Sequence, residues 1–80
     1  MEYKTLKEAR RVAREELLNN LGGYYRYIFK TKNGKYKIYS YYGNLENTGM
    51  TFIYAIDKSG AKFIWEDDGK DFKILVKKIK

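Results

Sequence analysis

Lysines and tyrosines are interleaved along the segment 24–42, and these residues are the best suited to chemistry in the chain. Asn33-Gly34 lies in the middle of this segment and is typical of a two-residue type I′ hairpin turn. In that register Lys30 is opposite Lys37, although like charges directly across a ladder are destabilising. One face of the hairpin then collects a candidate anion-binding set, which consists of Arg26, Lys30, Lys32, Lys35, Lys37, Tyr39 and Tyr41.

This basic face has two interpretations. Lysines on phosphates and aromatic rings under bases are the features of a platform for single-stranded nucleic acid, and the formal net charge of +7 favours polyanions in general. Lysine also protects edge strands against edge-to-edge aggregation, and Lys73, Lys77, Lys78 and Lys80 repeat the pattern on the last predicted strand. We favour edge protection, which needs no ligand, and keep the anion-binding face as the alternative.

An acidic cluster surrounds a later turn and consists of Glu66, Asp67, Asp68 and Asp71. Hard cations such as calcium prefer several oxygen ligands. The loop is too short for an EF-hand, however, and Asp68-Gly69 is mainly a turn sequence. We therefore predict neither a metal site nor an acid–base pair at this cluster.

The chain contains nine tyrosines, and they suggest a ligand pocket. Five of them are predicted on the concave side of the sheet, namely Tyr25, Tyr27, Tyr36, Tyr42 and Tyr54. Buried hydroxyls need partners, so these side chains could line a cavity between helix and sheet. The simpler interpretation places the rings at the margin of a core with their hydroxyls in water.

The chain has no Cys and no His. Disulfides and thiolate ligands are therefore excluded, together with Cys–His nucleophiles, Ser–His–Asp triads and the usual zinc sites. We predict that the protein is not an enzyme and needs no metal or cofactor. No apolar run is long enough to span a membrane, which predicts a soluble protein, cytoplasmic if it is natural.

The predicted positioning elements begin with a helix over residues 5–21. Thr5 and Glu8 form a capping box at its start, and Gly22-Gly23 supplies an end signal. The apolar residues follow helical spacing and form one stripe, which consists of Leu6, Ala9, Ala13, Leu17 and Leu21. Alanine at the centre of the stripe would let the helix lie close to a sheet.

From residue 24 onward the apolar pattern has a period of two, which predicts strands over 24–32, 35–46, 50–58, 61–67 and 70–79. Their turns are Asn33-Gly34, Asn47-Thr48-Gly49, Ser59-Gly60 and Asp68-Gly69. All these registers agree on one core face beneath the helix: Phe29, Ile38, Tyr54, Ile56, Phe63, Trp65, Phe72, Ile74 and Val76. The predicted fold class is α+β, with one N-terminal amphipathic helix packed on a five-stranded antiparallel β-meander, a curved sheet that could close in part.

A helix followed by long antiparallel strands resembles the cystatin/monellin-like architecture, without the cystatin inhibitory loop. The chain also resembles a de novo designed α+β scaffold. The features that carry this resemblance are the capping box, the Asn-Gly and Asp-Gly turns, the lysine-rich edges and the absence of Pro, Cys, His and Gln. That resemblance implies a monomer or symmetric homodimer with no evolved activity and no required partner. The alternative is a small basic binding module from a phage or bacterium, whose partner is single-stranded nucleic acid or a protein.

Overall fold

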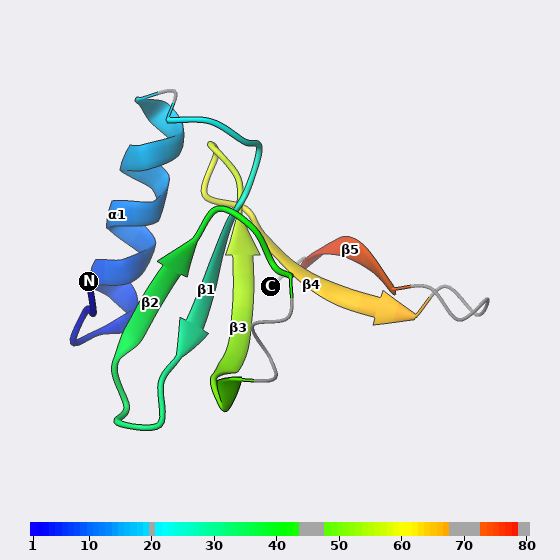
Figure 1. Ribbon diagram of the computed structural model, residues 1–80. Helices are drawn as coiled ribbons and strands as arrows, with labels where there is room; N and C mark the ends of the chain where they lie inside the picture. The colour runs from blue at the N-terminus through cyan, green and yellow to red at the C-terminus, as the bar shows by residue number, and fades with distance from the viewer. Residues whose placement is uncertain (20, 44–47, 68–72, 79–80) are drawn as a thin grey trace.

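The protein consists of one helix and five strands in the part of the chain that the computed structural model describes, residues 1–19, 21–43, 48–67 and 73–78 (Figure 1). The elements are α1 (Leu6–Leu18), β1 (Arg26–Lys30), β2 (Tyr36–Tyr39), β3 (Thr51–Ile56), β4 (Lys62–Asp67) and β5 (Lys73–Lys78). The sheet is antiparallel and open, and its strand order is β2-β1-β3-β4-β5. The prediction of one helix on a five-stranded antiparallel sheet is confirmed. Among the described residues, no helix is both long and apolar enough to cross a membrane.

Helix α1 begins where its capping signal predicts and ends earlier than expected. The Thr5 hydroxyl accepts a hydrogen bond from the Glu8 N–H at 3.1 Å, which satisfies one of the unpaired donors of the first turn. At the other end the Asn19 N–H donates to the Glu15 carbonyl, and the chain leaves the helix before Gly22-Gly23. Leu21, predicted as part of the buried stripe, is therefore 65% exposed.

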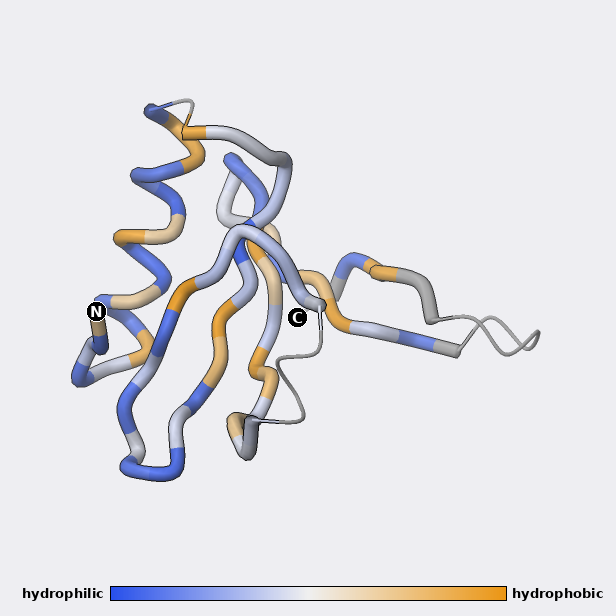
Figure 2. The backbone as a smooth tube through the Cα atoms, in the orientation of Figure 1, coloured by the Kyte–Doolittle hydropathy of each residue, from blue (hydrophilic) through white to orange (hydrophobic). Residues whose placement is uncertain are grey.

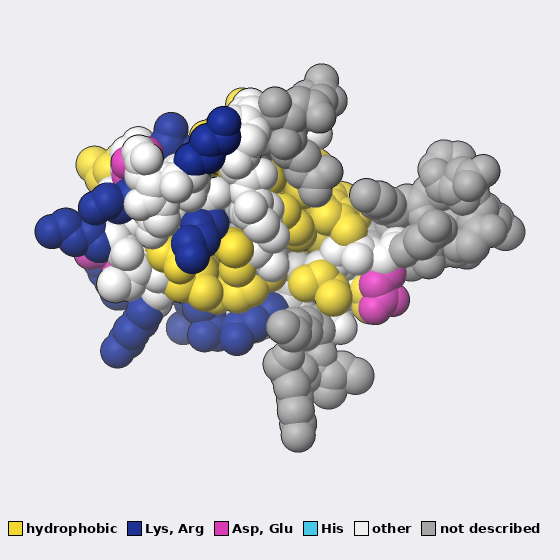
Figure 3. Space-filling view, turned by 90° about the horizontal axis from the view of Figure 1, so that it is seen from below, with side chains coloured by type: hydrophobic (Ala, Val, Ile, Leu, Met, Phe, Trp, Pro, Cys, Tyr) yellow, Lys and Arg dark blue, Asp and Glu magenta, His cyan; other side chains and the backbone are white. Residues whose placement is uncertain are grey.

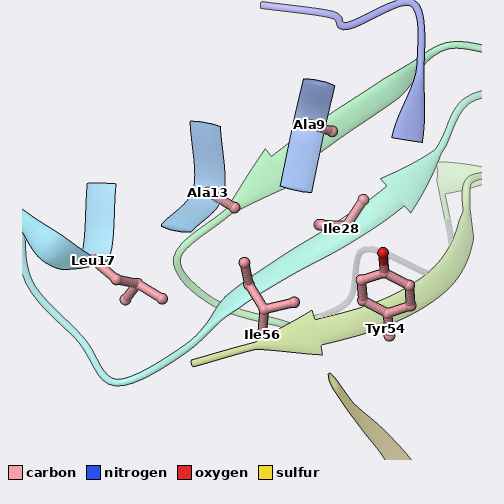
Figure 4. Packing of buried hydrophobic residues seen from close by; sticks show 6 residues of the cluster. All are labelled: Ala9, Ala13, Leu17, Ile28, Tyr54 and Ile56. Atoms are coloured by element: carbon pink, nitrogen blue, oxygen red, sulfur yellow. The ribbon is translucent and has the colours of Figure 1, made fainter. Parts of the chain in front are cut away.

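The main core lies between α1 and one face of the sheet (Figure 4). Ala9 and Ala13 are completely buried, and their small side chains let the helix approach the sheet closely. Hydrophobic positions recur along α1, β1 and β3 (Figure 2). The cluster consists of Ala9, Ala13, Leu17, Ile28, Tyr54 and Ile56. Complete burial of one isoleucine side chain contributes about 1.5–3 kcal/mol, so this small set supplies much of the stability.

The β1–β2 hairpin has a three-residue loop, and its predicted register was wrong by one residue. The Thr31 N–H donates to the Lys35 carbonyl at 2.8 Å, and the Gly34 N–H donates to the Thr31 carbonyl at 3.0 Å. Gly34 has a φ of 78°, as expected for the left-handed residue that ends such a loop. Phe29 consequently pairs with Lys37 and not with Ile38. A shift of one residue turns every side chain of one strand to the other face.

The β3–β4 connection repeats this geometry at residues 58–60. The Gly60 N–H donates to the Asp57 carbonyl at 3.0 Å, and the Asp57 N–H donates to the Ala61 carbonyl at 3.3 Å. The Asp57 carboxylate accepts hydrogen bonds from the Ser59 N–H, the Ser59 hydroxyl and the Ala61 N–H. Phe63 therefore pairs with Ala55 and not with Ile56, which a two-residue turn at the predicted Ser59-Gly60 would have placed opposite it.

Strand β3 pairs with β1, so the predicted meander connection from β2 to β3 was wrong. Strand β2 ends at Tyr39, and the described residues that follow it, up to residue 43, lead onto the face of the sheet opposite α1. The Tyr42 ring marks this path, because its centroid is 5.6 Å from that of Phe29. A bulge then places Ile53 as an extra residue of β3, packed against the helix-side core.

Strands β4 and β5 form a hairpin that diverges from the rest of the sheet (Figure 1). Strand β4 pairs with β3 only at its first two residues, whereas it pairs with β5 along its whole length. Trp65 is opposite Leu75 and not opposite Phe72, which a two-residue turn at the predicted Asp68-Gly69 would have required. Phe72 lies outside the described residues, as does the turn at Asp68-Gly69.

Both faces of the sheet are apolar, and the single predicted core face is divided between them. The helix side receives Ile38, Tyr54 and Ile56, and Val76 is paired with Ile64 on that same side. The opposite side receives Phe29, Phe63 and Trp65, as their ring contacts show. Phe72 and the side chain of Ile74 lie outside the description.

Candidate functional site

The face of the sheet opposite α1 carries a continuous group of aromatic rings, which we name the aromatic face. Phe29 is its buried centre, with ring centroids 5.7 Å from Tyr39, 5.6 Å from Tyr42 and 5.4 Å from Phe52. Trp65 is stacked on Tyr27 at 6.4 Å with an interplanar angle of 9°. The members are Tyr25, Tyr27, Phe29, Tyr39, Tyr41, Tyr42, Phe52, Phe63 and Trp65.

Most rings of the aromatic face are half-buried, because they cover one another while α1 packs on the other side of the sheet. Tyr41 is the most exposed, at 58%. Burial raises the pKa of the Tyr27 hydroxyl, and the neighbouring Tyr25 adds to this rise. The Trp65 Nε1–H is buried without a hydrogen-bond acceptor in the described part of the chain. The face thus offers partly exposed π-surfaces on the side of the sheet opposite α1.

Lysines flank the aromatic face on two sides. Lys37 is opposite Phe29 and Lys77 is opposite Phe63, and paired residues of an antiparallel ladder project to the same face. Seen from the end that carries the β1–β2 turn, Lys and Arg side chains lie to the left of, above and below an area of hydrophobic ones, and acidic side chains lie at its right (Figure 3). A polyanion lying across the rings would therefore meet positive charge at both margins.

A surface depression joins the aromatic face to the β1–β2 turn. The Tyr39 hydroxyl donates a 3.8 Å hydrogen bond to the Met50 sulfur. The depression is lined by Glu2, Thr31, Lys32, Lys37, Tyr39, Thr48 and Met50. Three residues of the predicted anion-binding set, Lys32, Lys37 and Tyr39, thus meet at one place.

The rest of the predicted set is divided between the two faces. Tyr41 belongs to the aromatic face, and Lys35 projects to the same side as Lys37 by strand alternation. Lys30 lies on the helix side, where its Nζ is 5.9 Å from the centroid of the Tyr36 ring. The predicted pairing of Lys30 with Lys37 was therefore wrong, since the two lysines lie on opposite faces.

Arg26 is a structural residue and is not available to a ligand. It is 3% exposed, and its Nε donates to the Glu16 carboxylate at 2.9 Å. Its Nη1 donates to the Gly22 carbonyl at 2.7 Å and to the Tyr25 carbonyl at 3.2 Å. The side chain thereby binds the segment after α1, where carbonyl groups lack helical partners. Arg26, a member of the predicted anion-binding set, therefore does not contribute to the aromatic face.

The five tyrosines that suggested a pocket are divided between the two faces of the sheet, and the acidic cluster lies partly outside the described residues. Tyr36 and Tyr54 lie on the helix side, whereas Tyr25, Tyr27 and Tyr42 belong to the aromatic face, so these five do not line one cavity. Asp68 and Asp71 of the acidic cluster lie outside the described residues. Within the described ranges, no group of three or more acidic side chains could hold a metal ion.

Lys77, Phe52 and the Tyr27–Trp65 stack are members of this site that the sequence analysis did not assign to it. The alternation of apolar and other residues along 61–65 was a usable signal, because it placed Phe63 and Trp65 on one face together. The alternation did not indicate which side of the sheet these two residues would occupy. Comparison of the chain with protein-family models, with curated proteins and with solved structures gave no match.

Proposed function

We propose that the protein binds single-stranded nucleic acid with the aromatic face. The observation that carries the proposal is the pairing of Lys37 with Phe29, which places a cation beside the rings on the sheet face opposite α1. The pairing of Lys77 with Phe63 repeats this arrangement at the other margin. The net charge of +7 adds a general attraction for polyanions.

Each component of this face has a defined contribution to binding. A base stacked on an aromatic side chain contributes about 1–3 kcal/mol, and Tyr41 has the ring surface most accessible for this. Lysine contacts with phosphates release counterions, which makes the affinity depend on salt. If Lys35, Lys37 and Lys77 each contact one phosphate, the affinity falls about 20-fold between 50 and 200 mM salt, from a slope of about −0.7 per contact.

Trp65 provides a direct measurement, because it is the single tryptophan of the chain and lies within the aromatic face. A titration of the protein with an unlabelled single-stranded oligonucleotide should quench or shift its emission in a saturable way. The dissociation constant is expected in the micromolar range at low salt and should rise about 20-fold at the higher salt concentration. Saturable quenching without salt dependence would contradict the role of the lysines.

Lys37→Glu and Lys30→Glu are matched variants, since they make the same charge change in the same hairpin on opposite faces. We expect Lys37→Glu to weaken binding by about tenfold or more and Lys30→Glu to weaken it only by the smaller general effect of net charge. Circular dichroism checks that both variants fold. Equal losses for the two variants would reject the aromatic face as the binding surface.

The competing proposal is a designed scaffold without evolved activity. It is supported by the capping box and by the short glycine-containing turns of both described hairpins. The observed strand order β2-β1-β3-β4-β5 differs from the sequential meander on which the likeness to the cystatin/monellin architecture was based. This proposal predicts no saturable change in Trp65 emission at 50 mM salt, so the same titration separates the two.

A further inference from the structure

We propose a second anion site, which binds a phosphate group in a groove between α1 and the β3–β4 turn. This site is separate from the aromatic face and does not depend on its proposed function. The groove is lined by Lys7, Arg10, Arg11, Arg14, Glu15, Leu18, Ser59 and Gly60. Its four cations come from successive turns of α1, where spacings of three and four residues bring side chains to the same side of a helix.

Two arginines of the groove are held in place by the backbone of the turn. Arg10 Nη2 donates to the Gly60 carbonyl at 3.1 Å, and Arg14 Nε donates to the Lys58 carbonyl at 3.0 Å. A Cβ atom at Gly60 would lie 3.7 Å from Arg10 Nη2 and 3.8 Å from Arg14 Cδ, so both side chains extend across this glycine. These contacts orient the two guanidinium groups before any ligand arrives, which reduces the entropy lost on binding.

Each of these two guanidinium groups has more donors than the turn uses. The contacts with the turn take one N–H of Arg10 and one of Arg14, whereas a guanidinium carries five. A phosphate presents three acceptor oxygens and forms paired hydrogen bonds with a guanidinium. The remaining N–H groups therefore match the oxygens of a single phosphate in the groove.

The charge balance of the groove favours an anion. Glu15 is the one acidic residue in its lining, and it is paired with Arg11 at 2.8 Å. Lys7, Arg10 and Arg14 lie at like-charge spacings along the helix, which are destabilising in the absence of a counter-charge. A bound phosphate would remove that repulsion. The phosphate could be a free or small-molecule group, or part of a nucleic acid.

The test is a ¹H–¹⁵N NMR titration of the full chain with pyrophosphate, at constant ionic strength maintained with chloride. The site predicts saturable shifts at the Ser59 and Gly60 amides and at the Nε–H signals of Arg10 and Arg14. Arg14→Gln should weaken this binding by about tenfold, because it removes a charged donor pair. Arg14→Lys keeps the charge and should give an intermediate loss, which separates anion binding from loss of the contact with the turn. Lys4→Gln, a helix-side change outside the groove, should leave the affinity within about twofold of the original.

A parallel titration with a 5′-phosphorylated oligonucleotide identifies the source of the phosphate. If the oligonucleotide produces the same shifts at a lower concentration than pyrophosphate does, the groove is assigned to nucleic acid. If it produces none of these shifts, the groove is assigned to small phosphorylated ligands. Lys37→Glu should not change the pyrophosphate titration, so failure of the aromatic face and failure of this groove are distinguishable. Shifts that do not saturate, or that spread evenly over the lysines of the surface, would overturn the proposal.

Discussion

Arg26 and Glu16 connect α1 to β1 through an ion pair of 2.9 Å in which the guanidinium is almost completely buried. The same guanidinium donates to the Gly22 and Tyr25 carbonyls. It therefore neutralises a carboxylate of the helix and satisfies backbone acceptors of the segment that follows. A residue of β1 thus fixes the path of the chain between the end of α1 and the start of β1.

Replacement of Arg26 by Ala should lower the free energy of unfolding by about 1–3 kcal/mol, the usual cost of leaving hydrogen-bond acceptors without their donor, because the Glu16 side chain that remains is 34% exposed. Urea denaturation measures this change. Glu15→Gln is the matched control, since Glu15 and Arg11 form an ion pair whose side chains are both more than half exposed, and its cost should stay below about 1 kcal/mol. Similar losses in the two variants would contradict the structural role of Arg26.

The turn between β1 and β2 can be tested at two neighbouring positions. Gly34→Ala should cost about 1–2 kcal/mol, because Gly34 has a positive φ that other residues adopt with strain. Apart from Gly34 and its two neighbours in the chain, no described residue has a heavy atom within 4 Å of the added methyl group, so the cost reports the backbone alone. Asn33→Ala should cost much less in this three-residue loop. A large loss at Asn33 as well would indicate the two-residue type I′ turn, in which both positions need positive φ.

The stability of the protein should fall at alkaline pH. Burial raises the pKa of the Tyr54 hydroxyl, the nearby Arg10 opposes this rise and Tyr36 adds to it. Since the folded-state pKa is above the unfolded value of 10.0, the stabilisation is complete below pH 10 and is lost as the pH rises through the folded-state value. Urea denaturation between pH 8 and 11 should show a smaller loss for Tyr54→Phe than for the unmodified chain; Tyr24→Phe, at an 85% exposed position, is the control.

Asp57 should contribute a loss of stability at acid pH. Partial desolvation raises the pKa of this carboxyl, but hydrogen bonds from Ser59 and Ala61, together with the charge of Lys77, lower it more. Because the net shift is downward from 3.8, the stabilisation is present above that pH and is lost as the pH falls through the folded-state value. Melting temperatures at pH 7 and pH 3 should differ less for Asp57→Asn. An unchanged difference would show that the turn hydrogen bonds do not depend on the charge.

The exposed ring of Tyr41 gives a test of stacking. Tyr41→Ala should weaken the binding of a single-stranded oligonucleotide by about 1–3 kcal/mol, and Tyr41→Phe should retain most of the affinity because it keeps the ring. The Trp65 titration measures both. If Tyr41→Phe loses as much affinity for the oligonucleotide as Tyr41→Ala, then the hydroxyl and not the ring surface makes the contribution of Tyr41 to binding.

The local elements of this protein follow from its sequence. Thr5 and Glu8 mark the start of α1, and glycines after polar residues mark the described hairpins, because capping and turn geometry depend on neighbouring residues only. The helix end was not predicted, since the contacts of Arg26 with the carbonyls of residues 21, 22 and 25 come from a strand.

The registers, the strand order and the division of the candidate site were decided by the tertiary structure. A one-residue shift is easily recognised when it moves apolar residues into water. Here both faces of the sheet are covered by apolar groups, α1 on one side and the aromatic face on the other, so the wrong and the observed registers both bury rings. The sequence by itself determined a helix, five strands and a basic, tyrosine-rich composition. Only the pairing of β1 with β3 and the three-residue loops decided that Lys37 lies with the aromatic rings and Lys30 and Arg26 do not.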